Sequence, residues 1–341
     1  MSIFGKDVAV SLVDDSFIFS TQTQASPLVL PAYVAIQTGT TRVLACGEEA
    51  KAMLGREPNS ISVVRVLVEG VIADQQSAES LFRFGLRKLL GRTVLMRPRV
   101  ILAFRPYEPG KWSVKNMATV GGAREVYLIE LGMATAIGMQ LDVQKPELKA
   151  VLSISDDWFE FSVISLAGVL SGTNGAIGSR ALVEDIQNHF TLVRQFRPEF
   201  AAIDSQLHSG GVNPCAVVDL PGWETWAGRT ELGRLTSQNA SRDEITVGMM
   251  PSLVRLTERI KAAIRSLPNE KQSQLSRATI HATGTAAKIP GLAQVIAQQL
   301  GHSVTPFSAD IHPSIDGCRT VLKELNFLKR VKPTGKGKVQ P

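Results

Sequence analysis

The fold is decided by the stretch Val8-Ala9-Val10-Ser11-Leu12-Val13, which is followed by Asp14-Asp15 and then by Phe17-Ile18-Phe19. Two apolar runs on either side of an acidic pair predict a β-hairpin with a tight turn. The same pattern returns near the middle of the chain. There Ala150-Val151-Leu152-Ser153-Ile154 precedes Asp156-Asp157, and a second strand runs from Trp158 to Ile164. Two such hairpins, about 140 residues apart, predict a duplicated architecture.

The rest of the chain is predicted to alternate between helices and strands. Between the hairpins, apolar spacing predicts helices at 78–90 and 113–121 and strands at 99–104 and 126–129. After the second hairpin we expect helices at 181–190 and 291–300, a strand at 279–282, a mixture of turn and strand at 213–219, and a final helix to about 328. Ser241-Arg242-Asp243-Glu244 matches a capping box that opens a long helix reaching Leu267. This alternation in two halves predicts an α/β protein with two similar lobes.

Composition and charge exclude several classes of protein. The chain has 341 residues, of which 44% are apolar and 20% charged, so it is neither disordered, collagen-like nor a coiled coil. Five of the residues behind the net charge of +6 lie in the last thirteen positions, namely Lys329, Arg330, Lys332, Lys336 and Lys338. The body is therefore nearly neutral and does not indicate a nucleic-acid-binding fold. We expect 329–341 to be a disordered basic tail.

Cysteine and histidine residues provide no chemical motif. Cys46, Cys215 and Cys318 are widely separated and form no CxxC pair, so neither a disulfide framework nor a zinc site is indicated. The histidines have no second ligand at metal-binding spacing, and we expect each to be structural. No apolar run approaches the roughly 18 residues that span a bilayer, and the N-terminus lacks the apolar core of a signal peptide. A cytoplasmic protein is expected.

Several blocks of the sequence resemble the MreB family of bacterial actins, whose members help to set rod shape. The resemblance is strongest at Gly122-Ala123-Arg124-Glu125-Val126-Tyr127-Leu128-Ile129-Glu130, and further similar blocks occur, in the family's order, at 47–56, 69–74, 97–100 and 133–138. It implies the actin-like fold of the actin and heat-shock chaperone ATPase superfamily. That fold has two lobes, each with a ribonuclease H-like core and a smaller subdomain, and a nucleotide cleft. Lobe I would comprise 1–147 with about 315–328 and a subdomain IB at about 32–68. Lobe II would comprise 148–314 with a subdomain IIB at about 181–236.

The two turns that hold phosphate in similar proteins are replaced in this chain. The family's first turn reads D-L-G-T-A-N, whereas this chain has Ser11-Leu12-Val13-Asp14-Asp15-Ser16. The metal-orienting Asp has become Ser, the Gly has become Val, and two carboxylates stand where the resemblance places phosphate. The family's second turn reads D-I-G-G-G-T-T, whereas this chain has Ser153-Ile154-Ser155-Asp156-Asp157-Trp158-Phe159. The glycines that allow close approach to an anion are absent from both turns.

Three further family elements have also diverged. The adenine-side E-E-I-K-x-E aligns with Ala201-Ala202-Ile203-Asp204-Ser205-Gln206, and the T-G-G-G-A loop aligns with Thr283-Gly284-Thr285-Ala286-Ala287. The E-E-P segment, whose second Glu positions the attacking water, reads Glu130-Leu131-Gly132. The degenerate ATP-site positions are Asp14, Asp15, Ser16, Asp156, Asp157, Trp158, Asp204, Gly284, Thr285 and Ala286.

Charge repulsion favours a loss of nucleotide binding. Two unit charges 4 Å apart interact by about 4 kcal/mol at an effective dielectric constant of 20. Four carboxylates around a triphosphate would therefore oppose binding unless a cation intervened. We interpret the chain as a pseudo-actin that neither binds ATP in the usual way nor hydrolyses it, with no catalytic residue, resident metal or cofactor.

Other interpretations of these turns stay open. Asp-Asp is ordinary turn chemistry. Alternatively, Asp14, Asp15, Asp156 and Asp157 could converge on Mg²⁺ or Ca²⁺, which prefer carboxylate oxygens. Trp158 and Phe159 either fill space or stack on a base. Trp223 and Trp226 either anchor a partner or pack within their own subdomain.

Membrane contact is expected where similar proteins carry an apolar loop that inserts into the bilayer. Leu95 and Met96 supply the apolar side chains, Arg97 belongs to a cationic collar, and Phe4 adds a second apolar contact. A partly buried loop is the alternative. The basic tail is either solvated, bound to the membrane, or bound to an acidic partner, and it has no aromatic residues with which to stack on nucleic-acid bases.

The resemblance implies a membrane-associated cytoskeletal scaffold at the inner face of the cytoplasmic membrane. It would assemble with itself or with a standard MreB and act with cell-shape or wall-synthesis proteins, without specific nucleic acid. A working ATP-binding filament protein and a non-polymerising adaptor are the alternatives.

Overall fold

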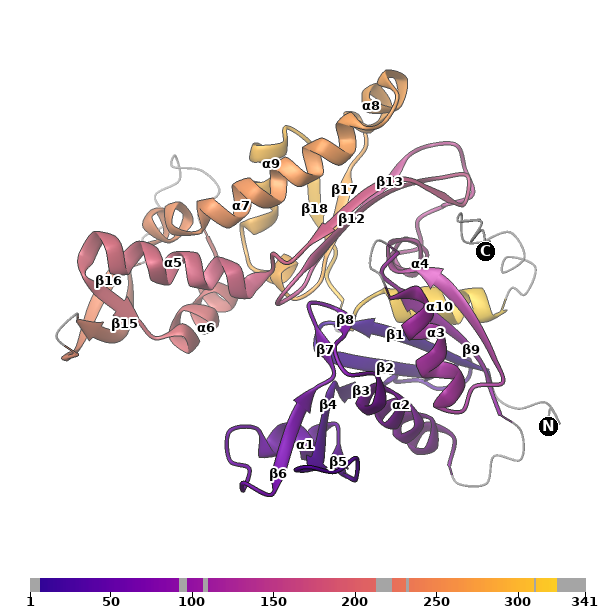
Figure 1. The fold of residues 1–341 in the computed structure, drawn as a ribbon. Helices are drawn as coiled ribbons and strands as arrows, with labels where there is room; N and C mark the ends of the chain where they lie inside the picture. The colour runs from indigo at the N-terminus through magenta and orange to yellow at the C-terminus, as the bar shows by residue number, and fades with distance from the viewer. Residues whose placement is uncertain are drawn as a thin grey trace, which may run out of the picture. The chain divides into compact units, whose positions relative to one another are not determined.

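The chain forms two compact units in the computed structural model, which describes residues 7–91, 97–106, 110–212, 223–230, 233–309 and 311–323 (Figure 1). The first unit comprises the described residues of Met1–Val143 and Ile311–Pro341, and the second those of Gln144–Asp310. The divisions fall within a few residues of positions 147 and 314. Each unit is built around its own five-stranded sheet.

Within the described residues, the first unit contains short strands and five helices. Its strands are β1 (Val8–Val13), β2 (Ser16–Thr21), β3 (Leu28–Pro31), β4 (Tyr33–Gln37), β5 (Val43–Cys46), β6 (Ile61–Arg65), β7 (Leu67–Val68), β8 (Val71–Ile72), β9 (Arg99–Phe104) and β10 (Glu125–Glu130). Its helices are α1 (Glu48–Met53), α2 (Gln75–Leu90), α3 (Lys111–Val120), α4 (Leu131–Gly138) and α10 (Ser314–Lys323).

The second unit contains the longest helix of the described chain. Its strands are β11 (Lys149–Ile154), β12 (Phe159–Ser165), β13 (Gly168–Gly175), β14 (Phe196–Pro198), β15 (Trp223–Thr230), β16 (Leu235–Ser241), β17 (Ile280–Thr283) and β18 (Val304–Pro306). Its helices are α5 (Ser179–Arg194), α6 (Phe200–Gly210), α7 (Arg242–Arg265), α8 (Asn269–Leu275) and α9 (Leu292–Leu300), with a short 3₁₀-helix η1 (Ala286–Lys288).

The two large sheets have the same topology. Their strand orders are β3-β2-β1-β9-β10 and β13-β12-β11-β17-β18. Each sheet contains an antiparallel hairpin, with Val8 opposite Thr21 in the first and Lys149 opposite Ile164 in the second. The first strand of each hairpin also pairs in parallel with a later strand, β1 with β9 and β11 with β17. The predicted duplication of the hairpin is confirmed, and the fold is the expected α/β architecture with one core per unit.

Helices cover both faces of the first sheet, which explains why every residue of β1 is buried. Val8 and Val10 share a core cluster with Leu81 and Phe82 of α2. On the opposite face, the Oγ atoms of Ser11 and Ser314 of α10 lie 2.6 Å apart. The alternation of side chains along the strand thus directs neighbours to two different helical layers.

Each unit also carries a small three-stranded sheet. In the first unit the order is β5-β4-β6, and Ala50 of α1 packs with Tyr33 and Ala35 of β4. In the second unit the order is β14-β15-β16, and Trp226 packs edge-on against Phe190 of α5 with the ring centroids 5.1 Å apart. Packing is therefore confirmed for Trp226. The side chain of Trp223, the segment 213–219 and the basic tail lie outside the described residues.

The predicted capping box begins α7. Ser241 is the N-cap, and its Oγ accepts a hydrogen bond of 3.2 Å from the Glu244 amide. The Glu244 carboxylate binds Arg194 at 2.6 Å, so the second half of the box is replaced by an ion pair. The helices predicted at 78–90, 113–121 and 181–190 begin two or three residues earlier than expected, and the one predicted at 291–300 begins at Leu292. The final helix is described only as far as Lys323.

Candidate functional site

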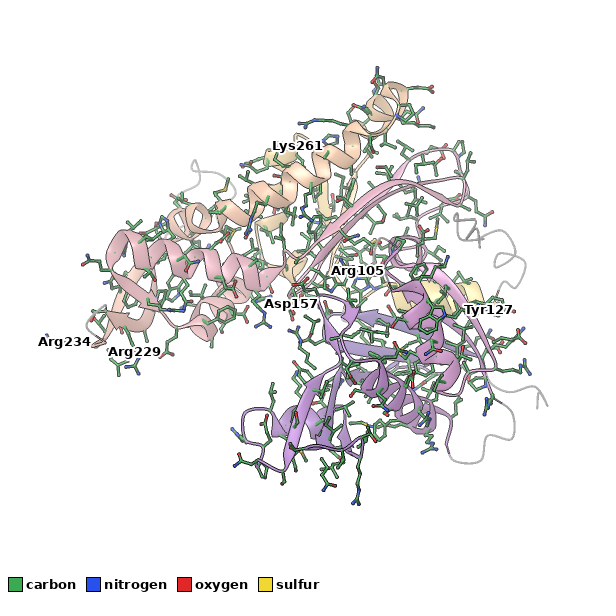
Figure 2. All side chains as sticks on the ribbon, in the orientation of Figure 1. Arg105, Tyr127, Asp157, Arg229, Arg234 and Lys261 are labelled. Atoms are coloured by element: carbon green, nitrogen blue, oxygen red, sulfur yellow. The ribbon has the colours of Figure 1, made fainter. Side chains whose placement is uncertain are left out.

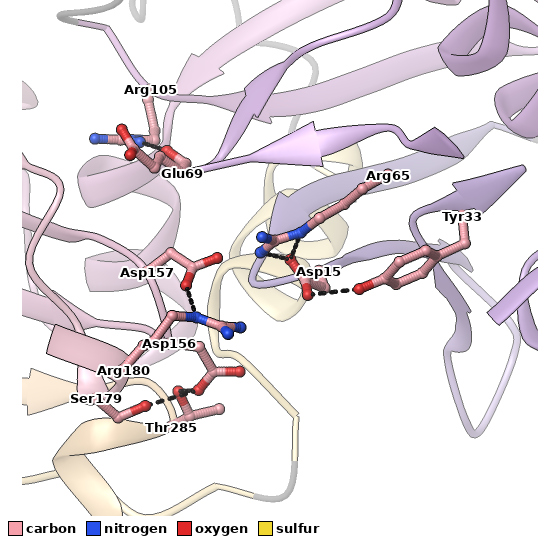
Figure 3. Close-up of polar contacts among 10 residues, drawn as sticks. All are labelled: Asp15, Tyr33, Arg65, Glu69, Arg105, Asp156, Asp157, Ser179, Arg180 and Thr285. Carbon is pink, nitrogen blue, oxygen red and sulfur yellow. Dashed lines mark hydrogen bonds and ion pairs between the residues drawn. The ribbon is translucent and has the colours of Figure 1, made fainter. Parts of the chain in front are cut away.

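The turn between β1 and β2 is held by side chains from the small sheet of the same unit. Asp15 Oδ1 accepts hydrogen bonds from Arg65 Nε at 3.1 Å and Nη2 at 2.5 Å, and its Oδ2 accepts one from the Tyr33 hydroxyl at 3.2 Å (Figure 3). Asp14 occupies the left-handed region with a φ of 52°, which aspartate tolerates in turns. Ser16 begins β2 opposite Val13. The first turn is thus an ion-paired structural turn.

The turn between β11 and β12 is joined to the first residues of α5. Asp156 Oδ1 accepts hydrogen bonds from Ser179 Oγ at 3.2 Å and Thr285 Oγ1 at 2.6 Å. Asp157, which is labelled in Figure 2, accepts one through Oδ1 from Arg180 Nε at 2.6 Å (Figure 3). The structure therefore brings three of the predicted positions, Asp156, Asp157 and Thr285, into one hydrogen-bonded cluster.

Main-chain carbonyl groups of this turn also accept hydrogen bonds from the first amides of α5. The Ser179 and Arg180 amides donate to the carbonyls of Ser155 and Asp156, at 3.0 and 2.9 Å. A Cβ atom at Gly178 would overlap the main chain of both acceptor residues, so the helix start and the turn are in close contact. Amides at the start of a helix are a common anion site. Here two of them are used by the hairpin.

Two aromatic side chains of the second turn are interior. Trp158 is 1% exposed, and Phe159 is fully buried in the core of the second unit. Neither ring offers a face for stacking on a base, so the space-filling interpretation is confirmed.

The three remaining site positions have different surroundings. Gly284 has a φ of 98°, and a Cβ atom there would overlap the main chain of Ile154, so glycine is required. Ala286 is fully buried at the start of η1. Asp204 lies on α6, where its Oδ1 is 3.8 Å from His208 Nδ1. Among the described residues, no hydrogen bond or ion pair joins Asp204 to the Asp156 cluster.

The expected repulsion from four uncompensated carboxylates was overstated. Asp15 and Asp157 are each paired with an arginine of their own unit, so two of the four charges are compensated. Neither Arg65 nor Arg180 was predicted, because each lies far along the chain from its partner and no local motif marks it. The steric features are what distinguish these turns from a phosphate-binding loop: neither contains a glycine, and the second buries an indole. These residues are a poor fit for a polyphosphate and its metal ion.

Positions that resemble the family's metal-orienting and water-positioning residues are also interior. Ser11 is fully buried, and Ser314 Oγ lies within 2.9 Å of His312 Nδ1 as well as beside Ser11. Leu131 is fully buried at the start of α4. Glu130 precedes it, and burial raises the pKa of its carboxyl, with the nearby charge of Lys111 opposing that effect.

Within the described ranges, no three His, Cys, Asp or Glu side chains are grouped so that they could hold a metal ion. None of the helices described is long and apolar enough to cross a membrane. Cys46 and Cys318 are buried free thiols. Of the expected membrane contacts, Phe4, Leu95 and Met96 lie outside the described residues, and Arg97 is exposed.

Comparison with known proteins identifies the family. The family model described as MreB/Mbl protein matches residues 6–330. The cell shape-determining protein Mbl of Bacillus subtilis is 24% identical over 306 residues, which cover 87% of this chain and 90% of that protein. The cell shape-determining protein MreB of Escherichia coli K12 is 26% identical over 312 residues, which cover 88% of each.

Solved structures agree on the fold. MreB5 of Spiroplasma citri bound to AMPPNP superposes with a TM-score of 0.81 at 18% identity, covering 95% of this chain and 98% of that one. The MamK double helical filament superposes with a TM-score of 0.71 at 14% identity, covering 94% and 99%. The duplicated sheets have an actin-like arrangement, and the match extends over nearly the whole chain, so this protein belongs to the MreB/Mbl family.

Proposed function

We propose that this protein is a cell-shape scaffold of the actin-like fold that does not depend on ATP hydrolysis. The observation that carries the proposal is the internal pairing of both hairpin turns, Asp15 with Arg65 and Asp157 with Arg180. These pairs give each turn a fixed set of partners within its own unit. Ligand phosphates would have to compete with them and approach carboxylate oxygens.

Three buried side chains support the loss of nucleotide chemistry. Trp158 fills space in the turn directly after the three positions where the family has glycine. Leu131 replaces the water-positioning Glu, and Ser11 replaces the metal-orienting Asp. Leucine has no group that could orient a water molecule for attack on a phosphorus atom. A metal-free, hydrolysis-free scaffold is the simplest function for this set of residues.

Self-association is part of the proposal. Relatives are named as cell shape-determining proteins, and MamK has been solved as a double helical filament. Assembly with itself or with a standard MreB would arrange cell-shape or wall-synthesis proteins. Because no γ-phosphate would hold a closed state, such a polymer would lack turnover timed by hydrolysis.

Titration calorimetry with ATP and Mg²⁺, using a standard MreB as the positive control, tests the nucleotide part of the proposal. We expect no heat of binding at micromolar nucleotide and no phosphate release. Micromolar binding would contradict the proposal and favour the ATP-binding filament, a function consistent with the AMPPNP-bound MreB5 neighbour.

Electron microscopy with and without ATP separates the remaining alternatives. Filaments in both conditions are expected from the hydrolysis-independent scaffold. Filaments only with ATP would indicate a working nucleotide switch. No filaments in either condition would indicate an adaptor that uses the fold as a docking surface.

We also propose a peripheral location at the inner face of the cytoplasmic membrane. Support comes from the apolar pair Leu95 and Met96, from the exposed Arg97 beside it, and from Phe4 near the N-terminus. In a pelleting assay with anionic liposomes, Leu95→Ser/Met96→Ser should leave most of the protein in the supernatant. Unchanged pelleting would refute the anchoring role of this pair.

A further inference from the structure

The first unit has a cationic recess, of which the proposed membrane contact uses only Arg97. It has a volume of about 800 Å³ and lies between α2, the residues that precede β9 and the end of α3. Its lining residues are Arg83, Leu86, Arg87, Leu90, Gly91, Arg97, Pro98, Val120, Gly121 and Gly122. We call it the arginine recess, and we propose that it binds an extended acidic segment of a partner protein.

Three guanidinium groups supply the charge. Arg83 and Arg87 are one helical turn apart on α2, which places both on the same face, and Arg97 lies on the adjoining segment. All three residues are exposed. No acidic residue is among the described lining residues, and no ion pair to these arginines occurs within the described part of the chain.

The nearest carboxylates along these elements have other partners. Glu79, one turn before Arg83, accepts hydrogen bonds from Gln75 Nε2 and Asn116 Nδ2, at 3.1 and 3.2 Å. Glu125 pairs with Arg124 at 3.3 Å and accepts a hydrogen bond from the Tyr127 hydroxyl. The charge of the recess is thus left for an external anion.

The recess is preorganised by contacts across it. Arg83 Nη2 donates to the Val120 carbonyl at 3.1 Å, which links α2 to the end of α3. The Arg124 amide donates to the Pro98 carbonyl at 2.8 Å and fixes the segment on the other side. Gly121 cannot be replaced without conflict, because a Cβ atom would come within 2.7 Å of the Met117 carbonyl. A groove that is formed before binding costs less ordering entropy when a ligand enters.

The side chains that form the recess specify the chemistry of the partner. Every cation among the described lining residues is arginine, whose planar fork binds carboxylates in a bidentate manner. Leu86, Leu90 and Val120 place apolar surface among the charges. An extended peptide that alternates acidic and apolar side chains matches this mixture. A flat bilayer surface would reach the outer guanidinium groups but would not fill a concave space of this volume.

Fluorescence polarisation on the full chain tests the proposal. The probe is a short fluorescein-labelled peptide that alternates glutamate and leucine, and the same peptide with glutamine for glutamate is the ligand control. We expect saturable binding of the acidic peptide that weakens as salt is raised, and no binding of the glutamine peptide. Arg87→Glu/Arg97→Glu should weaken binding by roughly tenfold or more, because the charge-assisted contacts to glutamate are lost and replaced by repulsion. Arg56→Glu, an equal charge change at an exposed position away from the recess, should bind as the parent does.

Neutral Arg87→Gln/Arg97→Gln provides a second variant should charge reversal impair folding, and thermal melts establish that each protein is folded. Equal affinity of the parent and the recess variants would overturn the proposal. So would an absence of peptide binding accompanied by pelleting with phosphatidylglycerol vesicles that the same substitutions abolish, since the recess would then be a lipid site. Neither result depends on whether the protein binds ATP.

Discussion

At the scale of single residues, the most informative groups are the charged and buried side chains around the two turns. Asp15 and Asp157 look alike in the sequence and have the same kind of partner, an arginine of their own unit. Trp158 looks like a possible ligand-stacking group and is instead 1% exposed. An aspartate or tryptophan in a turn therefore says little about ligand binding until its partners are known.

Glu130 supports a prediction about pH. Burial raises the pKa of the Glu130 carboxyl, so its ionisation opposes folding. The free energy of unfolding is therefore highest below the pKa of the unfolded chain, about 4.5, and falls as the pH rises through the higher pKa of the folded protein. Glu130→Gln removes this ionisation. The variant should melt at a higher temperature than the parent at pH 7 and at nearly the same temperature at pH 4, measured by circular dichroism. If the difference in melting temperature between the variant and the parent were the same at pH 4 and pH 7, desolvation of this carboxylate would have no effect on stability.

At the scale of elements, packing between helices and strands decides where each element ends and what it can tolerate. α4 and α10 approach so closely that a Cβ atom at Gly138 would overlap the Pro313 carbonyl, and one at Gly317 would overlap the Ala134 carbonyl. These helices come from the two separate segments of the first unit, and the whole second unit lies between them in the sequence. Glycine at both positions allows α10 to close the second face of the β1 sheet.

Gly317→Ala tests this close approach. Alanine favours a helix by about 1 kcal/mol over glycine, but overpacking costs typically about 1–3 kcal/mol, and the atom met here is main chain that cannot rotate away. The variant should therefore melt a few degrees below the parent. Gly168→Ala is the control, because a Cβ atom there would lie 3.7 Å from the Ser165 carbonyl oxygen, an ordinary contact, and this variant should melt near the parent. A higher melting temperature for Gly317→Ala would mean that α10 shifts without cost.

The start of α7 gives a second prediction at this scale. Ser241→Ala removes the acceptor for the Glu244 amide, and loss of an N-cap costs about 1 kcal/mol. We expect a lower melting temperature for this variant and recovery in Ser241→Asp, which restores an oxygen acceptor. If the melting temperature fell in both variants, the loss of stability would not come from the missing N-cap.

At the scale of the whole molecule, the chain is divided into two units with separate cores. The second unit is continuous in sequence, whereas the first needs α10 from beyond it. Ser314 and Cys318 of α10 contact Ser11 and the Val10 carbonyl of β1. The two units therefore differ in what a truncation removes.

A truncation experiment uses this difference. The segment Gln144–Asp310 should fold alone and melt cooperatively, because its core lies within it. A chain that ends at Asp310 should lose the cover of one face of the first sheet and aggregate or melt early. Size-exclusion chromatography and thermal melts compare the two, and a stable, monomeric 1–310 chain would contradict the role assigned to α10.

Sequence patterns alone determined the duplicated hairpins, the α/β class, the capped helix α7 and the resemblance that identified the family. These features are local, because strand alternation, helix spacing and caps depend on residues within a few positions of one another. The strands of the small sheets, such as β4 and β6, were not predicted, since their burial depends on partners elsewhere in the unit.

Only the tertiary structure decided how the candidate site is constituted. Asp15 meets Arg65 across 50 positions and Asp157 meets Arg180 across 23, and no local pattern encodes either pairing. The arginine recess likewise combines α2, the two residues before β9 and the end of α3. Charges compensate each other only when they lie close together in space. The sequence therefore shows how many aspartates the turns contain, whereas the fold determines which of them are paired.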